Sequence, residues 1–419
     1  MSDASGIYWT GPIYDRSGYG NVSRNYIRAL LAARIPVRVL NLGGIDSDID
    51  PEAARAVRAC EESRVGDRPI GVVHYLPHIL ESLRLRGVAA TVSASIFETH
   101  SIPAQWVRPL NRMDQVWVPS RFNESSYGAA GIRREKLRVI PYAVDCAYYH
   151  PMPRTTIPGA RGFVFLFVFA FDWRKGFDLL LRAYVSEFAA GEDVTLVLKV
   201  SPGFPAVPDL AGEILRSGLA ACEQPAGGWP PIVILTEPMS QSDLRSLYAG
   251  CDVCISTDRA NGWGMPCQEA MAMGKAAAAV NWSGSTEFMN EDNAFLIRPT
   301  GELEAVDPRL VEARGDLYQG QKWARVEASE VRRVLREAFE NRSLVREKGE
   351  RGAATVRENF SLERIGETIR GVLGTFSRLR STWQAPAAYL TEGWRRDLGR
   401  DLRECLGFRL RRSGLRCGG

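Results

Sequence analysis

Long apolar runs and metal-binding side chains are both scarce in this 419-residue chain. The longest apolar run, residues 163–171, is far shorter than the ~20 residues that a helix needs to cross a bilayer, and it predicts a buried strand instead. There are four histidines, and the eight cysteines are scattered rather than arranged in pairs at zinc-finger spacing. We therefore expect neither a metal site nor a disulfide framework.

An export signal is also missing, because residues 1–6 lack both a basic region and an apolar region. We therefore expect a cytoplasmic protein. An apolar fraction of 45% and a charged fraction of 24% are ordinary for globular proteins and do not fit a fibrous or disordered chain. The length is too great for one core and fits two domains of roughly 150 to 200 residues.

The formal net charge of +4 is concentrated in residues 391–419, where eight arginines face four acidic residues. Apolar residues such as Trp394, Leu398 and Leu402 recur there at helical spacing. Such a basic amphipathic helix either lies on an anionic membrane surface or a partner, or packs on its own protein. The sequence leaves these alternatives open.

Short apolar strands alternate with helical stretches in two parts of the chain. In the first part, strands are predicted at residues 7–9, 37–42, 71–75, 90–97, 115–119 and 137–141, with a helix at 21–34. In the second part, strands are predicted at 163–170, 194–200, 232–235, 253–256 and 276–281, with helices at 178–187, 240–249, 265–273, 327–360 and 363–379. This alternation is typical of parallel sheets covered by helices.

The proline- and glycine-rich residues 151–162 read as a linker between the two parts. We therefore predict an α/β protein with two Rossmann-like, doubly wound domains that face a central cleft. The predicted limits are 1–155 for the first domain, 156–375 for the second and 376–419 for a helical basic tail, for which packing back on the first domain is one of the alternatives.

Glycines and cations stand where predicted strands end. Gly18 and Gly20 lie between a strand and a helix, so they either admit a ligand to backbone amides or form a tight turn. Arg174 and Lys175 follow the strand at 163–170, and Lys199 closes the next strand. Three cations at neighbouring strand ends predict a site for an anion such as a diphosphate.

The segment from Asp258 to Gly274 carries the most information. Gly262, Gly264 and Pro266 directly precede a predicted helix, whose first amides are free to bind an oxyanion or a hydroxyl. Glu269 lies one turn into this helix, and a carboxylate there can accept two hydrogen bonds from a vicinal diol such as a ribose. An ordinary loop and helix start is the alternative.

This segment resembles the motif of glycosyltransferase family 4, in which two glutamates with seven residues between them surround a Gly-(Phe/Trp)-Gly-x-Pro turn. Over residues 7–375, further stretches resemble motifs of that family in the same order: residues 116–120, 140–145, 174–176, 247–252, 281–288 and 293–297. The resemblance implies a GT-B fold and a retaining hexosyltransferase that uses a nucleotide-diphosphate sugar, such as a UDP- or GDP-sugar, without a metal or other cofactor. In such a fold the first domain, residues 1–155, would bind the acceptor, and the second, residues 156–375, would bind the nucleotide-sugar.

The resemblance also implies roles for individual residues. Glu269 would hold the ribose, and the amides around Trp263, Gly264, Met265 and Pro266 would face the sugar and the diphosphate. Arg174, with Lys175 or Lys199, would neutralise the leaving diphosphate. Glu98 and His100 follow a strand where the family has a polar residue or a histidine near the reacting carbon, so either would bind the sugar or the acceptor.

Asn261 departs from the family pattern, because it replaces the first glutamate, which contacts the sugar. An amide still forms hydrogen bonds, but it carries no charge to stabilise a developing cation. Three hypotheses follow: a transferase with an unusual sugar contact, a non-catalytic or accessory subunit that binds a nucleotide-sugar, and a sugar-nucleotide epimerase.

The expected partners are also implied by the family. The acceptor would be a glycan, a lipid-linked intermediate or a protein, in cell-envelope or exopolysaccharide synthesis. The basic tail is compatible with peripheral contact at the inner face of the membrane. No nucleic-acid partner is expected.

Overall fold

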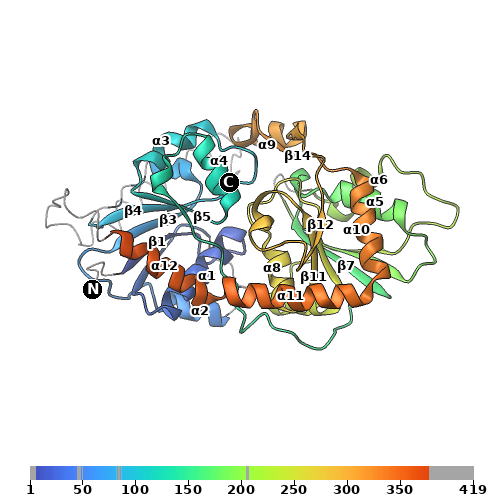
Figure 1. Ribbon diagram of the computed structural model, residues 1–419, viewed down its shortest axis with the longest axis horizontal. Helices are drawn as coiled ribbons and strands as arrows, with labels where there is room; N and C mark the ends of the chain where they lie inside the picture. The colour runs from blue at the N-terminus through green and yellow to red at the C-terminus, as the bar shows by residue number, and fades with distance from the viewer. Residues whose placement is uncertain are drawn as a thin grey trace, which may run out of the picture.

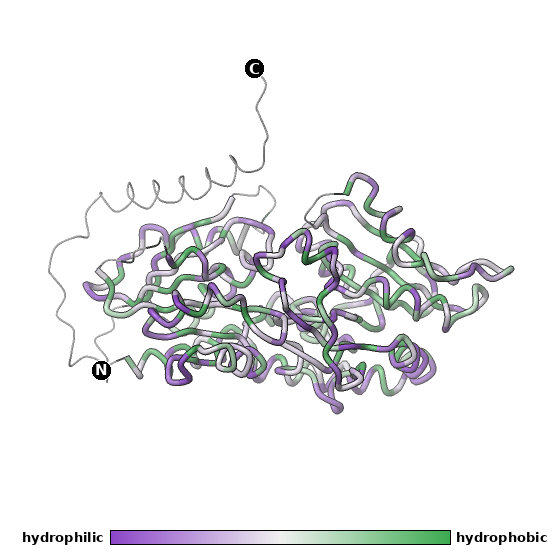
Figure 2. Tube along the Cα trace, turned by 90° about the horizontal axis from the view of Figure 1, so that it is seen from above, coloured by the Kyte–Doolittle hydropathy of each residue, from purple (hydrophilic) through white to green (hydrophobic). Residues whose placement is uncertain are grey.

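The computed structural model describes residues 6–44, 49, 51–81, 83, 85, 87–203 and 207–376. Two six-stranded sheets, each with all of its strands parallel, lie side by side (Figure 1, Figure 2). The strands of the first half span residues 7–139, and those of the second half span residues 163–297. The predicted α/β class with two doubly wound layers is confirmed.

The first sheet has the strand order β2-β1-β3-β4-β5-β6. Its strands are β1 (Ile7–Gly11), β2 (Val37–Asn41), β3 (Ile70–His74), β4 (Ala90–Ala94), β5 (Gln115–Val118) and β6 (Leu137–Val139). Its helices are α1 (Gly18–Ala32), α2 (Pro51–Arg58), α3 (Ala104–Arg112) and α4 (Arg121–Ala129), with short 3₁₀ turns η1 (Pro77–Glu81) and η2 (Arg134–Lys136). The order of β3, β4, β5 and β6 follows the chain, so successive crossovers build the sheet outward.

The second sheet has the order β12-β11-β10-β7-β8-β9. Its strands are β7 (Phe163–Ala170), β8 (Val194–Ser201), β9 (Ile232–Leu235), β10 (Val253–Ser256), β11 (Ala276–Val280) and β12 (Phe295–Ile297). Its helices are α5 (Phe177–Glu187), α6 (Leu210–Leu219), α7 (Gln241–Gly250), α8 (Met265–Ala272), α10 (Ala328–Glu340) and α11 (Arg342–Phe360), with 3₁₀ turns η3 (Trp173–Lys175) and η4 (Ser283–Glu287). The order reverses direction between β7 and β10, where parallel sheets place their ligands.

The uninterrupted apolar run of β7 follows from its central place in the second sheet. Phe163, Phe165 and Phe167 are buried in one apolar cluster, whereas Val164 and Leu166 are buried in another. Alternate residues of a strand point to opposite faces, and helices cover both faces of this sheet. Every position of the run is therefore apolar rather than every second one.

Residues 298–327 form an insert between β12 and α10 that the sequence patterns did not predict. The insert contains β13 (Leu303–Ala305), α9 (Pro308–Tyr318) and β14 (Lys322–Ala324), and its two strands pair antiparallel. Leu310 and Trp323 of the insert share an apolar cluster with Phe97 and Trp106 of the first half. Figure 1 shows α9 and β14 at the upper edge of the view, between the two halves. The insert therefore belongs to the second half in sequence but is packed on the first.

The last helices of the described chain return to the first half. The helix predicted at 327–360 is interrupted, because Asn341 (φ −111°, ψ 69°) leaves the helical range between α10 and α11. After α11, helix α12 (Leu362–Phe376) packs on α1 (Figure 1). The two helices approach closely at Gly366, where a Cβ atom would lie 2.3 Å from the carbonyl oxygen of Ala29.

Two predictions, on the basic helix and on the domain limits, stay predictions. The basic helix at 391–419 lies outside the described residues. The domain limits of 1–155, 156–375 and 376–419 also stay predictions. Within the described ranges, no helix is both long and apolar enough to cross a membrane.

Candidate functional site

A cleft of about 400 Å³ lies between the two halves, beyond the carboxyl ends of β3, β4, β7 and β10. Its walls are the start of α1, the segments after these strands, and part of α9. The predicted site residues that line it are Gly18, Glu98, Arg174, Lys175, Asn261, Trp263, Gly264, Met265 and Pro266. Gly20, His100, Lys199 and Glu269 are not among its lining residues.

The start of α8 presents backbone amides to this cleft. Gly264 precedes the helix with φ of 99°, a left-handed conformation that favours glycine, and Pro266 occupies the first turn. Among the residues that the structure describes, no side chain caps this helix. Pro266 has no N–H, and the N–H of Gln268 donates to the carbonyl oxygen of Gly264, so the N–H groups of Met265 and Cys267 are the ones left for an anion.

Asn261 shapes the turn before α8. Its Oδ1 accepts a hydrogen bond from the backbone N–H of Trp263 at 2.8 Å, and its own N–H donates to Ser283 Oγ at 3.0 Å. Gly284 lies so close beneath this turn that a Cβ atom there would be 1.9 Å from the carbonyl oxygen of Gly262. The side-chain oxygen that could contact a sugar is thus already used to hold the turn.

The start of α1 differs, because a side chain caps it. Ser17 Oγ accepts from the N–H of Gly20 at 3.1 Å, whereas the bond from the N–H of Asn21 to the carbonyl oxygen of Ser17 at 3.0 Å has its counterpart in α8, from Gln268 to Gly264 at 3.1 Å. Gly20 is needed for space, since a Cβ atom there would lie 2.3 Å from Asp15 Oδ1. Of the two predicted glycines, only Gly18 borders the cleft.

Arg174 and Lys175 lie in η3 and carry the cations of the cleft wall after β7. Arg174 Nε is 3.1 Å from Glu98 Oε1 across the cleft, and its Nη1 donates to the carbonyl oxygen of Ala260 at 2.8 Å. Lys175 Nζ donates to Asp258 Oδ2 at 2.8 Å. Both predicted diphosphate ligands are therefore neutralised by carboxylates, which a diphosphate would have to replace.

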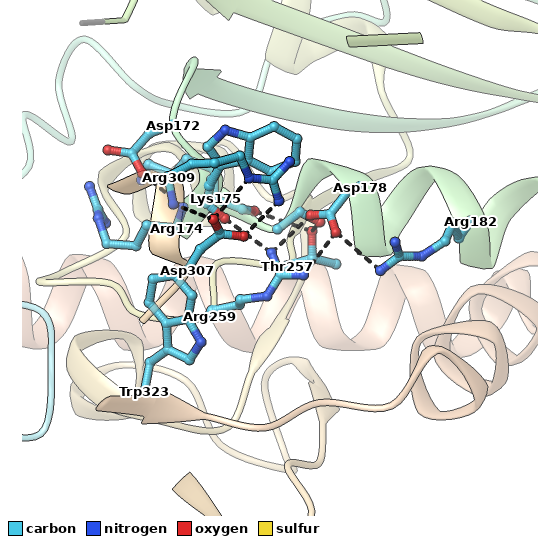
Figure 3. A network of polar contacts seen from close by, with 12 residues as sticks. Asp172, Arg174, Lys175, Asp178, Arg182, Thr257, Arg259, Asp307, Arg309 and Trp323 are labelled. Atoms are coloured by element: carbon cyan, nitrogen blue, oxygen red, sulfur yellow. Dashed lines mark hydrogen bonds and ion pairs between the residues drawn. The ribbon is translucent and has the colours of Figure 1, made fainter. Parts of the chain in front are cut away.

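A polar network holds η3 in place (Figure 3). Arg259 donates to both oxygens of Asp178, at 2.8 and 2.9 Å, and Arg182 reaches the same carboxylate at 3.1 Å. Arg259 also donates to the carbonyl oxygen of Trp173, so it ties the start of α5 to η3. Bidentate pairs of this kind fix geometry as well as charge.

The insert joins this network from the other side. Arg309, which is paired with Asp307, lies over the ring of Trp173. Arg259 lies over the ring of Trp323 (Figure 3). Burial within the network raises the pKa of the Asp178 carboxyl, whereas the hydrogen bonds from Arg259 lower it. The net result is a lowered pKa. The carboxylate of Asp178 therefore stays charged and keeps the cation-bearing turn anchored.

His100 is directed away from the cleft. The backbone N–H of Lys322 in β14 donates to its Nδ1 at 3.1 Å, and the backbone N–H of His100 donates to the carbonyl oxygen of Lys322 at 3.0 Å. Partial burial lowers the pKa of the imidazole, which favours the neutral ring that accepts this bond. In this arrangement His100 joins the first half to the insert.

Lys199 lies in β8 and is 5% exposed. Its Nζ donates to the carbonyl oxygen of Val200 at 3.3 Å, and burial lowers the pKa of its ammonium group. Lys199 therefore does not join Arg174 and Lys175 at the cleft.

Glu269 is buried behind the cleft wall in α8. Its carboxylate accepts from the Tyr248 hydroxyl at 2.8 Å and from Asn21 Nδ2 of α1 at 3.3 Å. Burial raises the pKa of this carboxyl to about 7, although the hydrogen bonds oppose the shift. Since Asn21 belongs to the first half, Glu269 contacts both halves.

Sequence patterns did not point to several residues of the cleft. Tyr318 and Arg314 come from α9, and Tyr19 and Tyr142 come from the first half. The Tyr318 hydroxyl donates to Glu98 Oε1 at 3.3 Å. A tyrosine and an arginine in a kinked helix that the sequence patterns did not predict carry no motif, so no signal in a single sequence would have selected them. Among the described residues, no group of His, Cys, Asp and Glu side chains could hold a metal ion.

Comparisons with known proteins concern the family and the fold. Residues 162–312 match the family model described as "Glycosyl transferases group 1". Similar solved structures include HepE of Anabaena in complex with UDP and glucose, with a TM-score of 0.60 and 18% identity over 88% of this chain and 100% of that chain. Sucrose-phosphate synthase from Thermosynechococcus elongatus gives 0.62 and 15% over 89% and 100%.

A further similar structure is α,α-trehalose 6-phosphate synthase from Burkholderia multivorans, with a TM-score of 0.60 and 12% identity over 90% of this chain and 100% of that chain. No curated protein sequence matches the chain. At these identities the structural likeness shows the fold alone, and that fold is the predicted GT-B arrangement.

Proposed function

We propose the reaction that this chain catalyses. Its group 1 domain and its fold identify it as a GT-B glycosyltransferase. The chain is a hexosyltransferase that moves a sugar from a UDP- or GDP-sugar to an acceptor hydroxyl, with retention at the anomeric carbon. The observation that carries the proposal is the free start of α8 opposite Arg174 and Lys175 in one cleft.

The donor half of the proposal is supported by charge and hydrogen bonding. A diphosphate placed between η3 and α8 would receive backbone N–H donors from one side and two cations from the other. HepE, one of the similar structures, binds UDP and UDP-glucose. Glu269, one turn into α8, would accept hydrogen bonds from the ribose diol in exchange for those it now accepts from Tyr248 and Asn21.

The chemical step would rest on leaving-group stabilisation. As the glycosidic bond to the diphosphate breaks, Arg174 and Lys175 would exchange Glu98 and Asp258 for the phosphate oxygens. Glu98 would then be free to accept a hydrogen bond from a hydroxyl of the sugar or the acceptor. Such preorganised cations contribute to the rate without a protein base.

The finer parts of the proposal come from the family resemblance. Transfer would need no metal, because protein cations serve the diphosphate. The acceptor would be a glycan, a lipid-linked intermediate or a protein in envelope or exopolysaccharide synthesis. The protein would work in the cytoplasm, with the basic residues 391–419 in contact with the inner face of the membrane.

A thermal-shift screen with UDP, GDP, ADP and dTDP tests the donor assignment. We expect a clear rise in melting temperature with one of these nucleotides, because a ligand that binds only the folded state stabilises it. Release of the same nucleoside diphosphate from its glucose conjugate then measures turnover. No shift with any of the four would contradict the proposal.

A non-catalytic subunit that binds nucleotide-sugars is the second candidate, and the position of Asn261 favours it. The Oδ1 of Asn261 is used by the turn before α8, and the residue carries no charge for a developing cation. Turnover by the wild type that is lost in Glu269→Ala would contradict this candidate. Nucleotide binding without turnover, across a panel of acceptors, would favour it over the transferase.

A further inference from the structure

The insert of residues 298–327 contributes to the cleft as well as to the contact between the halves. Arg314, Leu317 and Tyr318 of α9 line the cleft, and α9 is kinked at Arg314 (φ −141°, ψ 48°). Leu317 and Tyr318 are buried in the apolar cluster of the first half. The insert therefore forms a third wall, held against the half that was predicted to bind the acceptor.

The charges that line the cleft are balanced, with three carboxylates and three cations. Arg174 is paired with Glu98 at 3.1 Å, and Lys175 is paired with Asp258 at 2.8 Å. These pairs already satisfy two of the cations before any ligand is bound.

Among the described residues, Arg314 has the longest and most exposed ion pair of the three cations. Its nearest carboxylate, Asp316, is 3.8 Å from Nε and is 61% exposed to solvent. A contact of that length at the surface contributes little. Arg314 is itself one-third exposed, so its guanidinium reaches both the cleft and solvent.

We propose that Arg314 binds an anionic group, a phosphate or a carboxylate, on the acceptor sugar. This inference rests on the proposed function and deepens it, because it names the acceptor as a negatively charged one. The guanidinium has a planar arrangement of donors that matches both groups in a bidentate manner. Only the long, exposed contact with Asp316 has to be exchanged when such an anion enters.

The position of α9 favours the acceptor over the donor diphosphate. Tyr318 follows Arg314 by four residues in α9. Its hydroxyl donates to Glu98 Oε1, and its ring stacks on Phe97 at a centroid distance of 5.7 Å. These contacts place the end of α9 on the wall of the first half. The α8 amides and Lys175, by contrast, belong to the second half. An anion at Arg314 would thus lie on the acceptor side of the reacting carbon.

Binding of small anions to the full chain tests the inference. Inorganic phosphate and glucose 6-phosphate are titrated by calorimetry against wild type and Arg314→Gln, with and without the nucleotide that gives the largest thermal shift. Glucose is the neutral control ligand. Arg325→Gln is the matched control variant, since Arg325 lies in the same insert but is half-exposed and paired with Glu302 and Glu327.

We expect glucose 6-phosphate to bind wild type and Arg325→Gln at least about tenfold more tightly than it binds Arg314→Gln. The affinity for the nucleotide should be the same in all three proteins. Unfolding temperatures of the variants show whether each is folded.

Three results would overturn the inference. The first is that glucose binds wild type as tightly as glucose 6-phosphate does. The second is that neither inorganic phosphate nor glucose 6-phosphate binds at millimolar concentration. A loss of nucleotide affinity in Arg314→Gln would instead assign the guanidinium to the donor diphosphate. Absence of nucleotide binding to wild type contradicts the proposed function, whereas the anion titrations without nucleotide still decide the role of Arg314.

Discussion

The helices α1 and α8 begin at the same cleft, yet their first amides are used differently. In α1, Ser17 caps the helix, and its Oγ accepts from the N–H of Gly20. In α8, Gly264 holds the capping position with φ of 99°, and no described side chain accepts a hydrogen bond from the first turn. A capping side chain stabilises a helix by about 1 kcal/mol, so α8 forgoes this stabilisation and keeps its donors free.

This difference shows why a glycine turn before a helix is weak evidence for a ligand site. Both turns lie between a strand and a helix, and for each the sequence left a ligand site and an ordinary turn as alternatives. Only the turn before α8 combines an uncapped helix start with cations opposite it, at Arg174 and Lys175. The donor is therefore expected to depend on the α8 side and not on the start of α1.

The largest effect is expected from removing a cation opposite α8. Arg174→Ala should lower kcat by about 10²–10³-fold, because the leaving diphosphate loses a preorganised donor. Steady-state release of the nucleoside diphosphate measures this. Arg182→Ala is the control, since Arg182 pairs with Asp178 in the same network but does not line the cleft. An equal loss in both variants would mean that the network, rather than the cation, is responsible.

A smaller effect is expected from pH. The pKa of the Glu269 carboxyl is raised to about 7, so this group is largely protonated at pH 6 and largely ionised at pH 8. Only the carboxylate accepts two hydrogen bonds from a ribose, so nucleotide affinity should be about tenfold weaker at pH 6 than at pH 8. Calorimetric titrations across this range measure the affinity.

The nucleotide has an ionisable phosphate of its own, and Glu269→Gln separates the two contributions. The variant keeps the titration of the phosphate but has no carboxyl at this position. Its affinity should be lower than that of wild type at pH 8 and should change less with pH. An identical pH dependence in wild type and variant would assign the whole effect to the ligand.

Paired substitutions at the two helix starts test the comparison directly. Ser17→Ala should lower the free energy of unfolding by about 1 kcal/mol and leave nucleotide affinity unchanged, because it removes only a cap. Gly264→Ala should weaken nucleotide affinity, because Ala disfavours the left-handed backbone and its Cβ would lie 2.9 Å from Asn261 Nδ2. Urea unfolding and calorimetry measure the two quantities. A loss of affinity in Ser17→Ala would put the donor at α1 as well.

The smallest effect is expected from chelation. If the cations opposite α8 serve the diphosphate, EDTA should leave turnover unchanged, and added Mg²⁺ or Mn²⁺ should not raise it. The same release assay measures both. Turnover that requires a divalent ion would show that the α8 side does not suffice to stabilise the leaving group.

Much of the second half could be predicted from the sequence, because its strands are continuous apolar runs that end at polar residues. The predicted limits of β7, β9 and β10 agree with the structure. The turn before α8 was also located, since glycine and proline mark it in the sequence. Local chemistry determines these features, and a single sequence contains it.

Contacts between distant segments could not be predicted in this way. Glu98 meets Arg174 from the other half and Tyr318 from the insert, a residue 220 positions away. The direction of a side chain could not be predicted either, since Lys199 lies two residues before the end of β8 but is buried away from the cleft. The sequence locates a residue along its strand, whereas the packing of the sheet decides which of the two faces its side chain occupies.

The return of α12 to α1 has a consequence for the order in which the protein forms. The first half lacks part of its outer layer until residues 362–376 have left the ribosome, because Ala29 and Ala33 of α1 meet Gly366 of α12. The second half, by contrast, has all of its strands in one continuous stretch. The half that is translated first is therefore the one that is completed last, and premature termination before Leu362 would leave an apolar face of α1 exposed to other nascent chains.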